Sequence, residues 1–155
     1  MSVRHVVLIA GPQCSGKSTL ATNLAAERPG IVLDLDVIAR GLGSTRGWLH
    51  DEPVMARAEA IYQGELGRIV AAHDVVAYVV RSAPAARARA DLAARLRADV
   101  VYVLDPGMGE CLRRATVDGR PAGTHAGIRQ WYRRYAATGV DRRPSEPRLV
   151  TSREW

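Results

Sequence analysis

A glycine-rich segment near the N-terminus holds the residues whose spacing points most directly to chemistry. The pattern G-x-x-x-x-G-K-[ST] of phosphate-binding loops is matched by Gly11, Pro12, Gln13, Cys14, Ser15, Gly16, Lys17 and Ser18, and Thr19 follows. In such loops the backbone N–H groups and the start of the next helix surround a phosphate chain. The lysine reaches the terminal phosphates and the serine hydroxyl binds Mg²⁺. The segment therefore predicts a site for ATP and Mg²⁺ built from residues 11–19.

Lys17 is unusual because it is the one lysine of the chain, and the other 21 of the 22 basic side chains are arginine. An ammonium on a thin stem can lie along a phosphate chain, whereas a planar guanidinium needs a different space. We therefore expect Lys17 to be a catalytic residue at a position where arginine is no substitute.

Two aspartates follow the second apolar run, in the segment "IVLDLDVIAR" at residues 31–40. We expect them at the carboxyl end of a strand over 31–36, on the rim where α/β sheets bind ligands. Asp34 is predicted to bind the metal and to contact the substrate. Asp36 is predicted to contact the substrate and to act as the base that accepts the proton of the attacking hydroxyl. Arg40 is expected to hold an anionic group of the acceptor. The alternative is that the aspartates only cap the turn after the strand.

Apolar runs alternate with helical patterns along the whole chain. Strands are expected at 5–10, 31–36, 75–80 and 99–105, and helices at 17–28, 51–72, 84–97, 107–117 and 125–137, with an irregular tail from 139. This alternation predicts an α/β domain over 1–155, with a parallel sheet between helix layers. The first two strands are expected to lie near each other, which would bring the two aspartates close to Lys17.

The charge of the chain is uneven along the sequence. Residues 81–155 carry 15 basic and 8 acidic side chains, whereas residues 1–80 carry 7 and 8. A basic C-terminal half indicates an anionic partner such as nucleotide phosphates or nucleic acid. The alternative is that an arginine-rich composition reflects a GC-rich genome. No apolar run reaches the roughly 20 residues of a membrane-spanning helix, and no signal peptide is visible, so we expect a cytoplasmic protein.

Three segments together resemble the small P-loop kinases that include the polynucleotide 5′-hydroxyl kinases. They are the phosphate loop, "PGIVLDLDVIAR" at 29–40, and "VYVLDPGMGECLRRATVDGRPAGTHAGIRQWYRRY" at 101–135. The resemblance implies a P-loop NTPase fold of the nucleoside-monophosphate-kinase type, a three-layer α/β/α sandwich with an arginine-rich lid at about 113–127. It implies lid arginines at Arg113, Arg114 and Arg120, of which Arg120 contacts the transferring phosphoryl group. Arg114 would contact the nucleotide, and Arg143, in "RRPSEP" at 142–147, would stack on the purine.

Two features depart from the polynucleotide kinase pattern. When the arginines are aligned, the aspartate of those kinases falls at Val37, and the D-x-D spacing here resembles small-metabolite kinases of the shikimate type. Related kinases often carry an aspartate where the third strand of this chain ends in Arg81, which we expect to face an anionic substrate.

Three functions follow from these residues. The first is an ATP- and Mg²⁺-dependent kinase acting on the 5′-hydroxyl of a polynucleotide or nucleoside. The second is a small-metabolite kinase similar to the shikimate and gluconate kinases. The third is a non-catalytic or accessory ATP-binding module.

Overall fold

Five parallel strands form the centre of the computed structural model, which describes residues 2–43 and 52–144. The strands are β1 (Arg4–Ala10), β2 (Ile31–Leu33), β3 (Val75–Arg81), β4 (Val100–Val103) and β5 (Asp141–Arg142). Their order across the sheet is β2-β3-β1-β4-β5, and every pair is parallel. The two central strands are nearly continuous apolar runs because helices cover both faces of a parallel sheet.

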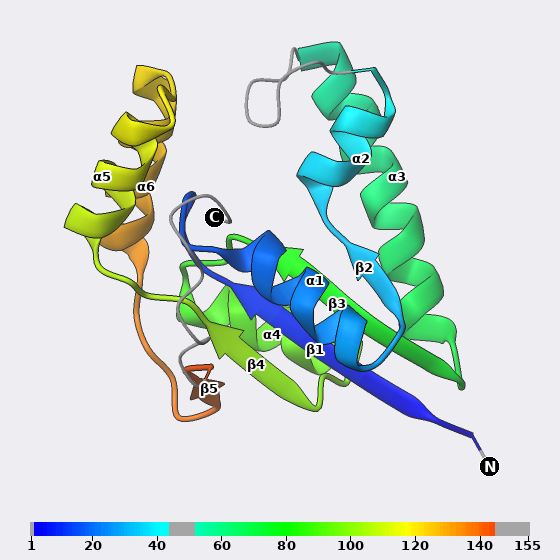
Figure 1. The fold of residues 1–155 in the computed structure, drawn as a ribbon. Coiled ribbons are helices and arrows are strands. Elements are labelled where there is room, and N and C mark those ends of the chain that lie inside the picture. Colours follow the sequence, from blue (N-terminus) through cyan, green and yellow to red (C-terminus); the bar gives the residue numbers. More distant parts are fainter. Residues whose placement is uncertain (1, 44–51, 145–155) are drawn as a thin grey trace.

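Helices connect the strands, and some of them form the outer layers of the sandwich. The helices are α1 (Lys17–Glu27), α2 (Leu35–Gly41), α3 (Glu52–Ala71), α4 (Ala86–Leu96), α5 (Met108–Val117) and α6 (Ala122–Arg134). The pairs α2/α3 and α5/α6 stand at opposite ends of the sheet in Figure 1. Within the described residues, no helix is both long and apolar enough to cross a membrane.

Alternate side chains of β1 enter two separate cores. Val6, Leu8 and Ala10 are fully buried against residues of α3, α4 and α6 on one face. Val7 and Ile9 belong to a core on the other face, with residues of α1. Figure 1 shows α1 lying across that face of the sheet. A third, smaller core joins α5 and α6 to the phosphate loop through Cys14. The predicted fold class, a P-loop α/β/α sandwich with a parallel sheet, is confirmed.

Several predicted boundaries are wrong for physical reasons. The strand predicted over 31–36 ends at Leu33, because the Asp34 side chain accepts a hydrogen bond from the backbone N–H of Asp36 and thereby begins α2. The helix predicted over 125–137 begins three residues earlier, directly after Pro121, which suits the start of a helix. The tail from 139, expected to be irregular, contributes the short edge strand β5.

The expected neighbourhood of the first two strands is also wrong. β3 lies between β1 and β2 in the sheet. The phosphate loop and Asp34 nevertheless meet, because the carboxyl ends of all parallel strands open at the same edge. The segment at 51–72 forms α3, although Asp51 itself lies outside the described residues.

Candidate functional site

The phosphate loop leads directly from the buried end of β1 into α1. Gly16 has a backbone φ of 94°, which favours glycine, and it precedes the first residue of the helix. A Cβ atom at Gly11 would lie 2.8 Å from the backbone oxygen of Leu104 and 2.7 Å from the Ser15 hydroxyl. The loop is therefore packed tightly against the end of β4, and glycine is required at this close approach.

Lys17 lies back over the loop that carries it. Its Nζ atom donates a hydrogen bond to the backbone oxygen of Pro12 at 2.7 Å. Burial of the ammonium lowers the pKa of Lys17 from 10.5 to about 8, and the negative charges of Asp34 and Asp36 partly oppose this shift. A bound phosphate chain would favour the charged form, so ligand binding and protonation of Lys17 are coupled.

Ser18 and Asp34, the two residues predicted to bind a metal, are in direct contact. The Ser18 hydroxyl donates a hydrogen bond to Oδ2 of Asp34, whose side chain is almost completely buried. A hydroxyl and a carboxylate are oxygen ligands of the kind that Mg²⁺ prefers, with phosphate oxygens and water completing its shell. The described residues hold no cluster of three or more acidic, histidine or cysteine side chains suited to a metal ion. The pair therefore fits a nucleotide-bound Mg²⁺ better than a metal held by protein alone.

A cavity of about 480 Å³ lies at the carboxyl edge of the sheet beside this pair. Its walls are residues 13–19 of the loop, residues 34–36, Met55 and Glu59 of α3, residues 80–82 of β3 and the turn after it, and Arg120. The structure thus brings Lys17, Asp36, Arg81 and Arg120 around one space. Asp36, in the first turn of α2, is exposed and faces the cavity from outside the phosphate loop.

Three predicted site residues lie elsewhere. Arg40 lines a neighbouring cavity of about 460 Å³, which shares Ser18 and Asp34 with the first. Arg114 does not line either cavity, but its Nη1 atom donates to the backbone oxygen of Cys14 at 3.1 Å and so supports the loop from α5. Arg143 is exposed just after β5 and lines neither cavity, and the rest of its segment, 145–147, lies outside the described residues.

The end of the cavity nearest α3 is formed by an ion pair that the sequence reasoning missed. Arg81 donates two hydrogen bonds to Glu59, at 2.8 and 3.1 Å, and its guanidinium lies 4.8 Å from the centre of the Tyr62 ring. Hydrogen bonds from Arg81 lower the pKa of Glu59. The only local indication that Glu59 lies near the site is its place in α3, directly after the buried Ala58.

The helical hairpin of α5 and α6 supplies the opposite wall. Arg120, between the two helices, is half-buried and makes long contacts of 3.4 Å to Asp118. Arg113 points into solvent and is paired with Glu110, which also binds Arg114. These two arginines hold the pKa of Glu110 at about 2, Arg113 with the larger effect. Of the three arginines predicted for a lid, Arg120 is therefore the one that lines the cavity.

A family model described as an AAA domain matches residues 6–131 of this sequence. The chain belongs to this family. No curated protein matches the chain.

Solved kinases share the fold of this AAA domain protein at low sequence identity. A shikimate kinase from Acinetobacter baumannii is 19% identical, with a TM-score of 0.58, over 98% of this chain and 88% of that one. A gluconokinase from Sinorhizobium meliloti is 13% identical, with a TM-score of 0.60, over 95% of this chain and 86% of that one. A sugar kinase from Janibacter is 19% identical, with a TM-score of 0.56, over 91% and 83%. The chain therefore has the fold of small P-loop kinases.

Proposed function

We propose that this protein is a phosphotransferase that moves the terminal phosphate of ATP to a hydroxyl group of a small molecule. The observation that carries the proposal is the single cavity that Lys17, Ser18, Asp36 and Arg120 share. Lys17 and Ser18 belong to the donor side, Asp36 faces the acceptor side, and Arg120 reaches in from the helical hairpin. Lys17 and Arg120 would stabilise the negative charge that develops on the transferring phosphoryl group from two sides.

Asp36 is the proposed proton acceptor. Its backbone N–H is fixed by Asp34, so the first turn of α2 holds the carboxylate at a defined place beside the phosphate loop. A carboxylate there would orient the attacking hydroxyl and take up its proton as the new bond to phosphorus forms. Mg²⁺ bound with the nucleotide would neutralise phosphate charge, held by Ser18 and Asp34.

The end of the cavity formed by Glu59 and Arg81 favours a small hydroxylated acceptor over a phosphate-bearing one. The charge of Arg81 is balanced by two hydrogen bonds to Glu59, and Asp36 adds a further negative charge. An acceptor phosphate would have to compete with Glu59 for Arg81, whereas sugar-like hydroxyls can bond to both partners without separating them. Structural neighbours named for shikimate, gluconate and sugars support an acceptor of this size.

A polynucleotide or nucleoside 5′-hydroxyl is the second candidate acceptor. Support comes from the resemblance of residues 29–40 and 101–135 to polynucleotide kinases and from the basic C-terminal half. The neighbouring cavity adds to this, because Arg40 lies there beside Ser18 and Asp34 and offers a site for the phosphate of a longer acceptor. Stacking of Arg143 on the purine of ATP stays a prediction, and it applies equally to both candidate acceptors.

Transfer of labelled terminal phosphate from ATP to a panel of acceptors tests the proposal. The panel contains neutral polyols, sugars, hydroxy acids, nucleosides and oligonucleotides with a free 5′-hydroxyl. Labelling of polyols or sugars that is weakened by Glu59→Gln supports the first candidate. Labelling of oligonucleotides that is weakened by Arg40→Met, and unaffected by Glu59→Gln, supports the second. Release of phosphate to water alone would refute both and indicate an accessory ATPase.

A further inference from the structure

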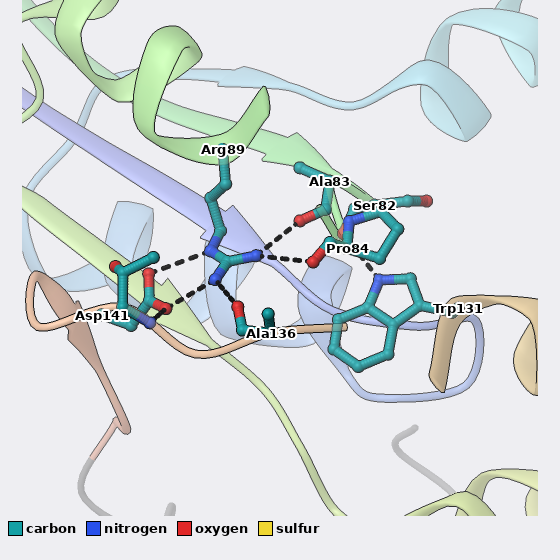
Figure 2. Close-up of polar contacts among 8 residues, drawn as sticks. Ser82, Ala83, Pro84, Arg89, Trp131, Ala136 and Asp141 are labelled. Carbon is teal, nitrogen blue, oxygen red and sulfur yellow. Dashed lines mark hydrogen bonds and ion pairs between the residues drawn. The ribbon is translucent and has the colours of Figure 1, made fainter. Parts of the chain in front are cut away.

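Arg89 of α4 is buried to 1% exposure and lines neither of the cavities described above. Its guanidinium makes five hydrogen bonds, shown in Figure 2. Two go to the carboxylate of Asp141 in β5, at 2.9 and 2.6 Å. The others go to the backbone oxygens of Ala83, Pro84 and Ala136, at 2.9, 3.0 and 2.6 Å. A guanidinium has five N–H groups, so the donor capacity of Arg89 is fully used.

The backbone turn that Arg89 holds is unusual. Ala83 has a φ of 36°, in the left-handed region that a residue with a Cβ rarely adopts. The turn follows β3 directly, and Arg81 and Ser82, immediately before Ala83, line the cavity. Local strain of this kind persists where surrounding contacts impose it, and both hydrogen bonds from Nη1 of Arg89 end on this turn.

The same turn is a junction between the phosphate loop and the helical hairpin. The backbone oxygen of Ser82 accepts hydrogen bonds from the indole N–H of Trp131 in α6, at 2.8 Å, and from the N–H of Gly11, at 3.3 Å. The oxygen of Pro84 also accepts from the N–H of Ala136, just after α6, at 3.4 Å. Figure 2 shows Trp131 and Arg89 approaching the turn from different elements.

We propose that Arg89 is a positioning residue that fixes the turn at 82–84 and, through it, the placement of the hairpin relative to the phosphate loop. Arg89 itself touches no ligand site, since it lines neither cavity. Nη1 of the guanidinium holds the turn, whereas Nε and Nη2 hold Asp141 of β5 and Ala136 after α6, so one side chain ties these three segments together through separate N–H groups. The hairpin carries Arg120, so this junction sets where the lid arginine stands.

Two matched substitutions separate positioning from simple stabilisation. Arg89→Lys keeps a positive charge for Asp141, but an ammonium has three donors and cannot serve the five acceptor contacts of the fork. Asp141→Asn removes the charge of the partner and leaves the bonds from Arg89 to the turn in place. Both variants weaken the ion pair, and Arg89→Lys alone releases Ala83 and Pro84.

The measurements are the NMR signal of the Trp131 indole N–H and the affinity for AMPPNP with Mg²⁺, each at a temperature where the variant is folded by circular dichroism. We expect Arg89→Lys to shift the indole signal and to weaken AMPPNP binding by about fivefold or more. Asp141→Asn should change the affinity by less than about twofold. A folded Arg89→Lys protein with the wild-type signal and affinity would overturn the proposal, as would equal effects of the two variants.

A third variant keeps the proposal testable if Arg89→Lys fails to fold. Trp131→Phe removes the indole donor to Ser82 and keeps an aromatic ring in the core, so it loosens the junction from the side of α6. Weakened AMPPNP binding by folded Trp131→Phe supports the coupling, and unchanged binding refutes it. The inference rests on nucleotide binding in the phosphate loop, so failure of the wild-type protein to bind AMPPNP would refute the proposed function instead.

Discussion

Raising the pH should weaken nucleotide binding through one side chain, Lys17. Burial lowers the pKa of this ammonium to about 8 in the ligand-free loop. A bound phosphate chain returns the pKa toward or above its ordinary value, because the charged form gains an anionic partner. At a pH above the pKa of Lys17 in the ligand-free loop, nucleotide binding therefore requires uptake of a proton. The affinity for the nucleotide falls as the pH rises further.

The size of the effect follows from the pKa of about 8. Near pH 7 about nine tenths of the Lys17 side chains are already charged, and near pH 9 about nine tenths are neutral. The affinity for ATP or AMPPNP should therefore fall by about tenfold between these two values. The Cys14 thiol of the same loop contributes little in this window, because burial raises its pKa above the usual 9.0.

Isothermal titration calorimetry in buffers of different ionisation enthalpy measures both the affinity and the proton uptake. The wild-type protein should take up about half a proton per nucleotide near pH 8. Lys17→Arg stays charged throughout, so any binding it retains should not depend on pH in this range. An affinity of the wild-type protein that is constant from about pH 7 to about pH 9, or an equal slope in Lys17→Arg, would refute the reasoning.

The same shift also has a consequence for stability. The folded-state pKa of Lys17 lies below the unfolded value of 10.5, so between about 8 and 10.5 the unfolded chain binds more protons. Stability of the ligand-free protein should therefore rise with pH across that window. Lys17→Met removes the buried charge, and at neutral pH it should increase the free energy of unfolding by up to about 3 kcal/mol, and by less where solvent reaches the side chain. Lower stability of Lys17→Met in urea denaturation would contradict this.

Three further substitutions test local features of the fold and site. Gly30→Ala should lower the free energy of unfolding by about 2 kcal/mol or more, since its Cβ would lie 2.5 Å from the backbone oxygen of Val76; an unchanged urea midpoint would contradict this. Gly127→Ala should raise the free energy of unfolding by about 1 kcal/mol through helix propensity. The new Cβ would lie 2.7 Å from the end of the flexible Gln13 side chain, which can move aside, so AMPPNP binding should be retained; loss of binding would contradict this. Asp34→Asn keeps a capping side chain for α2 and should abolish the dependence of ATP binding on Mg²⁺ with little change in stability; an unaltered Mg²⁺ titration would exclude Asp34 from the metal site.

Much of the fold was predictable because its signals are local. Continuous apolar runs identified β1 and β3, and the spacing of Gly11, Gly16 and Lys17 identified the phosphate loop. The end of β2 was misplaced because one side-chain contact, from Asp34 to the N–H of Asp36, decides where the strand becomes a helix.

The long-range features could not be predicted from the sequence alone. Glu59 and Arg81 lie 22 residues apart, and their pairing depends on how α3 crosses the end of β3. Arg89 lies three and seven residues before Leu92 and Leu96, so helical spacing places it on the apolar face of α4, but nothing local shows which distant groups satisfy its charge. Its partner Asp141 belongs to a strand of two residues, too short to show a periodic pattern.

The role of Asp36 in phosphate transfer is the most direct test of the account. The measurement is the rate of transfer of labelled phosphate from ATP to whichever acceptor the panel identifies, in the wild-type protein and in Asp36→Asn. We expect Asp36→Asn to lower the transfer rate by about a hundredfold or more, because the proton acceptor is lost. Its affinity for AMPPNP with Mg²⁺ should change by less than about threefold. Transfer at the wild-type rate by Asp36→Asn would contradict the assignment of this carboxylate as the base.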